Sequence, residues 1–196
     1  MNKKVIVLGL VLLFVVMMAG ASVLYNRLGE AAAPEQLAVQ LTQPAEESVS
    51  EPVNYSAPDF TVYDLEGNAV RLSDFLGKPV VLNFWASWCG PCQMEMPDFH
   101  EKYRQLGDQV QFLMVNMTDG SRETVEIASA FIAERGYGFP VVYDLDYDAA
   151  ITYGVYSLPT TYFIDAQGNA IAQAPGAIDG ETLQRGIDLI FTPQNG

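Results

Sequence analysis

Residues 78–92 decide the fold and read KPVVLNFWASWCGPC. The first part, Lys78–Trp85, is a short apolar run rich in β-branched and aromatic residues, which is typical of a buried strand. From Pro91 onward the pattern becomes helical, so Cys89 lies where a strand passes into the first turn of a helix. The apolar candidates for the core face of that helix are Met94, Met96, Phe99, Tyr103 and Leu106.

Cys89 and Cys92 are the only two cysteines in the chain, and Gly90 and Pro91 separate them. A disulfide across so short a loop constrains the unfolded chain little, so a structural role is disfavoured. The free N–H groups and the positive dipole end of a helix stabilise a thiolate and lower its pKa from about 8.5. We therefore predict a redox-active disulfide, in which Cys89 attacks a client disulfide and Cys92 resolves the mixed disulfide. No metal or other cofactor is expected.

Metal binding is the main alternative interpretation of the two cysteines. A single Cys-X-X-Cys motif supplies only two ligands, whereas structural zinc usually needs four, and the one histidine is His100. A copper(I)-handling protein remains open, because methionine sulfur is a soft ligand, although methionines at these spacings are more often core residues. Inert buried thiols are the third interpretation. The methionines concerned are Met94, Met96, Met114 and Met117.

Three stretches carry a resemblance to a known family: APDF at 57–60 with LSDF at 72–75, LNFWASWCGPC at 82–92, and LPTTYFID at 158–165. They resemble the TlpA/ResA group of membrane-anchored, thioredoxin-like thiol–disulfide oxidoreductases of bacteria. The resemblance runs from about Ala57 to the C-terminus. It implies a thioredoxin fold outside the cytoplasm that exchanges electrons with client disulfides, with Trp88, Gly90 and Pro91 contacting the client. A peroxidase is disfavoured, because Ala86 stands where a Thr-x-x-Cys arrangement would need threonine.

Leu158-Pro159 resembles the loop whose cis-proline faces the disulfide in thioredoxin folds. Proline is the only residue for which a cis peptide costs as little as about 0.5–1 kcal/mol. The resemblance implies a cis bond that places the Leu158 backbone beside Cys89, where it can pair with an extended client peptide. The alternative is an ordinary trans proline that opens the strand Thr160–Ile164.

Glu95 is the candidate proton acceptor. Cytoplasmic thioredoxins carry a buried aspartate on the strand before the motif, and here Asn83 occupies that position. Glu95 lies three residues after Cys92, one helical turn along on the same face, and matches the glutamate of ResA-like proteins. In an apolar pocket its pKa would rise, so that it could deprotonate Cys92. The alternative is a solvated charge on the helix surface.

The N-terminus indicates where this chemistry takes place. Lys3 and Lys4 precede Val5–Tyr25, an uncharged run that would reach roughly 30 Å as a helix, enough to cross a bilayer. The positive-inside rule then leaves residues 1–4 in the cytoplasm and exports the rest. A cleaved signal peptide is the rival, because Ala19-Gly20-Ala21 fits a cleavage site. We expect a single-pass anchor in the bacterial cytoplasmic membrane.

Residues 26–56 are rich in Ala, Pro, Glu, Gln and Ser and predict a flexible acidic linker, which leaves 57–196 as the redox domain.

The formal net charge of −14 excludes nucleic-acid binding. It favours a basic client such as apocytochrome c; a copper-site protein is the other client considered. A membrane-embedded donor of the thiol-transfer type would supply electrons. A disulfide-forming oxidase remains the alternative direction of the same chemistry.

The predicted fold class is α/β, a thioredoxin-like fold with a central mixed sheet. An N-terminal hairpin extension is expected from Asp59–Tyr63 and Ala69–Leu72. A central helix-strand insertion, typical of the TlpA/ResA group, is expected over Arg122–Tyr143 as a site of client selectivity. The remaining expected elements are a strand at Gln109–Asn116, helices at Arg122–Arg135, Tyr147–Tyr153 and Asp179–Phe191, and a hairpin of Thr160–Ile164 with Ala170–Gln173.

Overall fold

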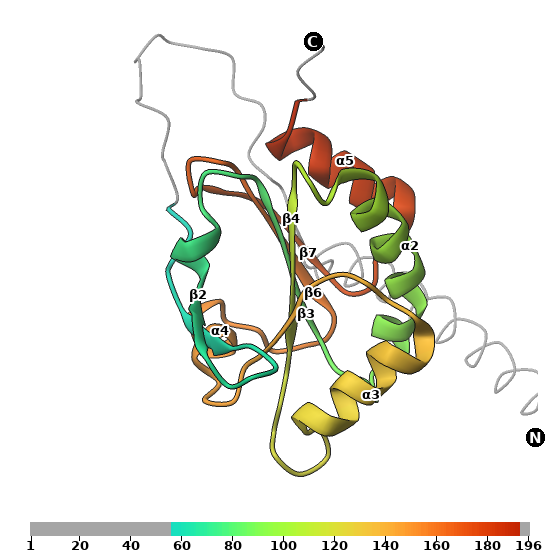
Figure 1. The fold of residues 1–196 in the computed structure, drawn as a ribbon. Helices are drawn as coiled ribbons and strands as arrows, with labels where there is room; N and C mark the ends of the chain where they lie inside the picture. Colours follow the sequence, from blue (N-terminus) through green and yellow to red (C-terminus); the bar gives the residue numbers. More distant parts are fainter. Residues whose placement is uncertain (1–55, 193–196) are drawn as a thin grey trace, which may run out of the picture. The chain divides into compact units, whose positions relative to one another are not determined.

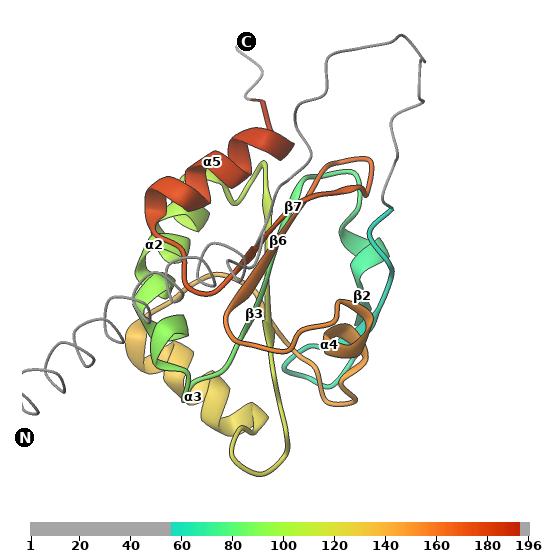
Figure 2. The same ribbon diagram turned by 180° about the vertical axis from the view of Figure 1, so that it is seen from behind.

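The computed structural model describes residues 56–192 (Figure 1). They form a seven-stranded mixed sheet with the strand order β2-β1-β5-β4-β3-β6-β7. Helices α2, α3 and α5 cover one face of the sheet, whereas α4 lies on the other face (Figures 1 and 2). The strands are β1 (Thr61–Tyr63), β2 (Ala69–Arg71), β3 (Val80–Trp85), β4 (Gln111–Asn116), β5 (Val141–Tyr143), β6 (Thr160–Ile164) and β7 (Ala170–Pro175). The helices are η1 (Leu72–Phe75), α2 (Gly90–Leu106), α3 (Val125–Arg135), α4 (Asp148–Thr152) and α5 (Gly180–Ile190).

The central strand β3 explains the apolar run before the cysteines. All six of its side chains are buried, and it pairs in parallel with β4 and antiparallel with β6. Successive side chains of a strand point to opposite faces. Val81 and Trp85 accordingly join the core under α2, α3 and α5, whereas Leu82 and Phe84 join the core on the other face. A strand covered on both faces needs apolar residues at consecutive positions.

The predicted fold class is confirmed. Strands β1 and β2 form the antiparallel N-terminal hairpin, and β1 joins the main sheet through β5. Helix α3 and strand β5 form the central insertion, with β5 parallel to β4. Strands β6 and β7 form the second hairpin, and α5 begins after Asp179, whose side chain accepts a hydrogen bond from the Thr182 amide.

Two local predictions were wrong. Helix α3 begins at Val125 after its N-cap Thr124, and not at Arg122, so Arg122 and Glu123 belong to the loop after β4. Met94 was expected in the core, but 70% of it is exposed, whereas its neighbour Glu95 is buried. Both differences bear on the functional site.

Between residues 56 and 192, no helix is both long and apolar enough to span a bilayer. The predicted anchor Val5–Tyr25 and nearly all of the predicted linker lie outside the described residues.

Candidate active site

The two cysteines lie at the start of α2, immediately beyond the end of β3. Cys89 is the N-cap of the helix and forms a disulfide with Cys92, with the two Cα atoms 5.2 Å apart. The Cys92 amide donates to the Cys89 sulfur at 3.2 Å. No acidic residue lies in the first turn of α2, so the positive end of the helix dipole acts on Cys89 without opposition. Cys89 is 5% exposed and Cys92 is fully buried, so Cys89 is the sulfur that a client can reach.

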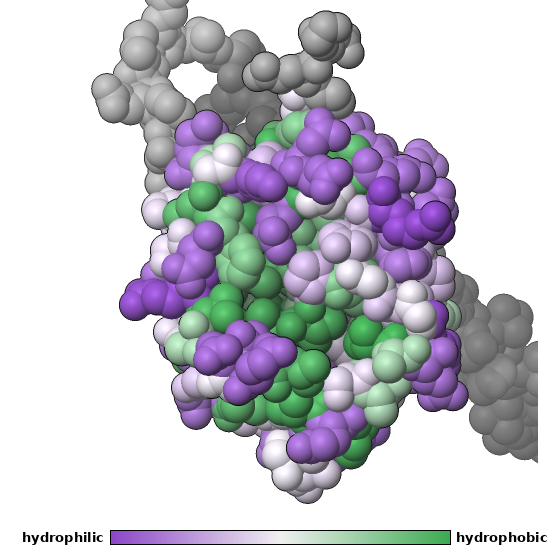
Figure 3. Space-filling model, viewed as in Figure 1, coloured by the Kyte–Doolittle hydropathy of each residue, from purple (hydrophilic) through white to green (hydrophobic). Residues whose placement is uncertain are grey.

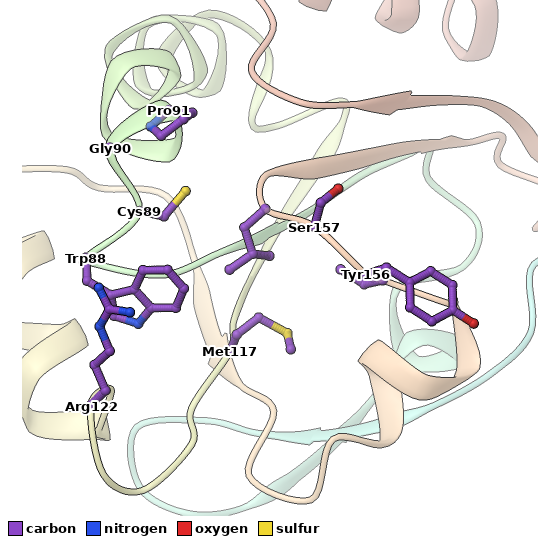
Figure 4. A pocket seen from close by; sticks show the side chains of 10 residues that line it. Trp88, Cys89, Gly90, Pro91, Met117, Arg122, Tyr156 and Ser157 are labelled. Carbon is purple, nitrogen blue, oxygen red and sulfur yellow. The ribbon is translucent and has the colours of Figure 1, made fainter. Parts of the chain in front are cut away.

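A pocket of about 570 Å³ opens beside Cys89 (Figure 4). Trp88 and Cys89 lie on one side of it, Tyr156 and Ser157 face them from the loop before β6, and Met117 comes from the loop after β4. Most of the wall is apolar, and Arg122 is its one charged residue among those described. The complete lining is Trp88, Cys89, Gly90, Pro91, Met117, Arg122, Val155, Tyr156, Ser157 and Leu158.

The Leu158–Pro159 peptide bond is cis, as predicted. Leu158 lines the pocket together with Cys89. Pro159, the other residue of this pair predicted to contact the client, is buried and does not line the pocket, and its carbonyl accepts a hydrogen bond from the Gly176 amide at 2.8 Å. Within residues 56–192, neither the N–H nor the carbonyl of Leu158 has a backbone hydrogen-bond partner. These groups are therefore available to an extended peptide in the pocket.

Glu95 is buried, with 2% of its surface exposed, which excludes the alternative of a solvated helix-surface charge. One carboxylate oxygen accepts a hydrogen bond from the Asn83 side-chain amide at 2.9 Å, and the other accepts from the Ile178 backbone amide at 3.0 Å. Burial disfavours the charged form and raises the pKa of Glu95 to about 7, although both hydrogen bonds act in the opposite direction. A carboxyl group one turn from Cys92 can thus exchange protons near neutral pH.

Asn83 connects Glu95 to strand β6. Its side-chain amide also donates to the Thr161 hydroxyl at 3.0 Å, and its own carbonyl oxygen is buried without a partner among the described residues. Asn83 thus takes the place of a thioredoxin aspartate but acts as a hydrogen-bond donor to the glutamate on α2. Asn83 and Glu95 were each predictable from the sequence as separate features, but their contact and the hydrogen bond from Ile178 were not.

The loop after β4 supplies two site residues that the sequence analysis missed. Glu123 is fully buried, and its carboxylate accepts from the Ser87 amide at 2.7 Å, the Ser87 hydroxyl at 2.6 Å and the Asn116 side-chain amide at 2.6 Å. The Arg122 guanidinium lies over the Trp88 ring, 3.9 Å from its centroid (Figure 4). Adjacent residues of this loop therefore hold the two residues that precede Cys89.

The candidate copper ligands are divided between the buried core that also contains both cysteines, the pocket beside Cys89 and the exposed surface. No group of three or more His, Cys, Asp or Glu side chains suited to a metal ion occurs in the described part of the chain. Met96 and Met114 are core residues, Met94 is exposed, and Met117 lines the pocket. His100 packs against Tyr137 and Phe139, and its Nδ1 accepts from the Gly138 amide.

Comparisons with known proteins agree with this geometry. The AhpC/TSA family model matches residues 53–173. The thiol–disulfide oxidoreductase ResA of Bacillus thuringiensis subsp. konkukian is 38% identical over 70% of this chain and 78% of its own length. ResA of Bacillus subtilis is 34% identical over 74% of this chain and 78% of its own length.

Among solved structures, the exposed lipoprotein thioredoxin Etrx1 of Streptococcus pneumoniae superposes with a TM-score of 0.56. It is 36% identical, over 67% of this chain and all of the other. The chain belongs to the AhpC/TSA family of thioredoxin-like proteins, and within it to the ResA-like thiol–disulfide oxidoreductases.

Proposed function

We propose that this oxidoreductase reduces disulfides of exported client proteins while tethered to the extracytoplasmic side of the bacterial cytoplasmic membrane. The uncharged run Val5–Tyr25, preceded by Lys3 and Lys4, supports a single-pass anchor. The observation that carries the proposal is the unequal exposure of the two sulfurs. Cys89 borders a pocket of about 570 Å³, whereas Cys92 is buried on the side of the helix that also carries the buried Glu95.

The reaction begins with the reduced protein. The Cys89 thiolate attacks one sulfur of the client disulfide, forming a mixed disulfide and releasing the other client sulfur as a thiolate that takes up a proton. The Glu95 carboxylate accepts the proton of Cys92, and the Cys92 thiolate then attacks the Cys89 sulfur. The second client sulfur leaves as a thiolate, so the client gains two electrons and the Cys89–Cys92 disulfide forms. A membrane-embedded thiol donor returns the pair to the dithiol.

The client is held by its backbone and by apolar contacts. The unpaired Leu158 N–H and carbonyl lie beside Cys89 and would pair with an extended client segment. Trp88, Gly90 and Pro91 form the wall on the cysteine side. The net charge of −14 favours a basic client at long range, for which apocytochrome c is the leading candidate and a copper-site protein the second.

The midpoint potential of the Cys89–Cys92 couple tests the direction of the reaction. A potential near that of thioredoxin, about −270 mV, supports a reductase, whereas a value near the roughly −120 mV of DsbA would instead establish a disulfide-forming oxidase. Cys89→Ser should abolish reduction of a disulfide client, and Cys92→Ser should accumulate the mixed disulfide on Cys89.

The location is tested in intact cells with a membrane-impermeant thiol reagent after mild reduction. Because the chain has no other cysteines, labelling of Cys89 reports directly on the side of the membrane. Labelling only after cell lysis would contradict an extracytoplasmic redox domain. The Cys89→Ser variant is the control for labelling at the buried Cys92.

A further inference from the structure

The pocket beside Cys89 has a charge opposite to that of the protein. The chain carries a formal net charge of −14, yet no described acidic residue lines the pocket, and Arg122 is its one charged side chain. A client segment that reaches Cys89 therefore approaches a negatively charged protein but enters an apolar pocket that contains one cation.

Two sets of contacts, one to the side chain and one to the adjacent residue, restrict the position of Arg122. Its guanidinium lies over the Trp88 ring, and cation–π contacts of this kind restrict an otherwise flexible side chain. The next residue, Glu123, is anchored by three hydrogen bonds to Ser87 and Asn116. The backbone at Arg122 is thus fixed to the same turn that carries Cys89.

The Arg122 guanidinium retains its hydrogen-bonding capacity. The side chain is exposed, and within residues 56–192 it makes no ion pair and no hydrogen bond. Asp119 is the nearby acid on the same loop, but its Oδ1 accepts from the Ser121 and Glu123 amides, and Asp119 does not line the pocket. The planar donors of arginine match a carboxylate in bidentate geometry.

We propose that Arg122 is a specificity-determining residue, which favours client segments carrying an aspartate or glutamate beside the reacting cysteine. This inference rests on the proposed reduction of client disulfides. The net charge of the protein acts at long range on the whole client, whereas Arg122 acts at contact on the residues that flank the cysteine. An exposed ion pair of this kind corresponds to a preference of about two- to fivefold.

The test uses three disulfide-linked peptides that differ only in the residue next to the reacting cysteine, which is Glu, Gln or Lys. For the wild-type protein, kcat/KM should be about two- to fivefold higher for the Glu peptide than for the Gln peptide, and lowest for the Lys peptide. Arg122→Gln should abolish the order, and Arg122→Lys, which keeps the charge, should retain it in part. Arg104→Gln is the matched control, because it removes the same charge in the last turn of α2, away from this pocket, and should leave the order intact.

Equal rates for the three peptides with the wild type, or an order that persists in Arg122→Gln, would overturn the proposal. Loss of the order in both Arg122 variants, together with a shift of tryptophan emission, would assign the effect to the placement of Trp88 and would also overturn it. Binding of the same peptides with serine for cysteine to the oxidised protein gives a second measurement. If no peptide is reduced, the proposed reductase function fails, while the binding order still decides the role of Arg122.

Discussion

Met94 and Glu95, which are neighbours on α2, reverse the usual burial of apolar and charged side chains. An apolar side chain is normally buried and a carboxylate exposed, yet here Met94 is exposed and Glu95 is buried. The Glu95 carboxylate is tolerated because Asn83 and the Ile178 amide donate hydrogen bonds to it. They offset the cost of burial only in part, so the pKa of Glu95 rises to about 7.

The first prediction concerns the kinetic role of Glu95. In Glu95→Gln, thiol–disulfide exchange near pH 7 should slow on the order of a hundredfold, because no nearby base takes the proton of Cys92. The step in which Cys92 resolves the mixed disulfide should rise through an inflection near pH 7 in the wild type, and the variant should lack this inflection. Stopped-flow reduction of a disulfide peptide over pH 5–9 measures this. A pH profile that keeps the inflection in the variant would remove Glu95 from the mechanism.

The second prediction concerns stability. Because folding raises the pKa of Glu95 above its usual 4.5, the folded state binds more protons than the unfolded state between about pH 4.5 and pH 7. The wild type should therefore lose stability relative to Glu95→Gln as pH rises through this range, by on the order of 3 kcal/mol. Urea unfolding of both oxidised proteins at pH 4.5 and pH 8 measures the difference. The buried Asp144 is present in both proteins and cancels. An unchanged difference would show that the carboxyl titrates normally.

At the scale of elements, the loop between β4 and α3 fixes the turn that carries Cys89. Glu123 is buried and receives its hydrogen bonds from Ser87, two residues before Cys89, and from Asn116 at the end of β4. The central insertion is thereby connected to the active site through a side chain rather than through sheet pairing alone.

The third prediction tests this connection. Glu123→Gln replaces one accepting oxygen with an amide nitrogen that faces buried donors, and should reduce the free energy of unfolding by about 1–3 kcal/mol. Exchange at Cys89 should slow as well, because the Ser87–Trp88 turn is less constrained. Ser87→Ala removes only the hydroxyl donor and should cost about 1 kcal/mol. Urea unfolding and exchange rates measure both effects. Equal effects of the two substitutions would show that the Ser87 amide and Asn116 contribute nothing.

The same loop shows where the sequence analysis failed. Arg122 and Glu123 suit a helix by propensity, and the apolar pattern that follows them is helical. The start of α3 is set instead by local hydrogen bonds. The Thr124 hydroxyl accepts from the Ile127 amide, and the Asp119 carboxylate accepts from the Ser121 and Glu123 amides. Thr124 is a recognisable N-cap residue, and choosing it would have placed Glu123 before the helix.

At the scale of the whole molecule, the site forms at one end of the sheet, where β3 and β4 finish and β6 begins. Cys89 follows β3, Met117 and Arg122 follow the parallel strand β4, and Leu158 precedes the antiparallel strand β6. Sites in α/β folds commonly form beyond the carboxyl ends of parallel strands. The strand-to-helix passage at Cys89 was predictable from the pattern of residues 78–92. The buried contacts of Glu95 and Glu123 were not, because their partners are distant in sequence.

The surface suggests how a client approaches. On the face shown in Figure 3, apolar residues gather near the centre and hydrophilic residues surround them. With a net charge of −14, the long-range field of the protein would attract positively charged clients before any contact is made. This field is screened over about 10 Å at 0.1 M salt, whereas apolar contacts in the pocket are not weakened by such salt.

The last prediction follows from the difference in range between the electrostatic field and the apolar contacts. With a lysine-rich disulfide client, kcat/KM should fall about tenfold or more between 0.01 and 0.2 M salt, because electrostatic steering accelerates association by at least that factor. An acidic client of the same length should react faster as salt rises, because screening removes its repulsion. A neutral client is the control and should change little. Steady-state rates at several ionic strengths measure the three cases. A lysine-rich client that is insensitive to salt would show that the acidic surface has no part in client capture.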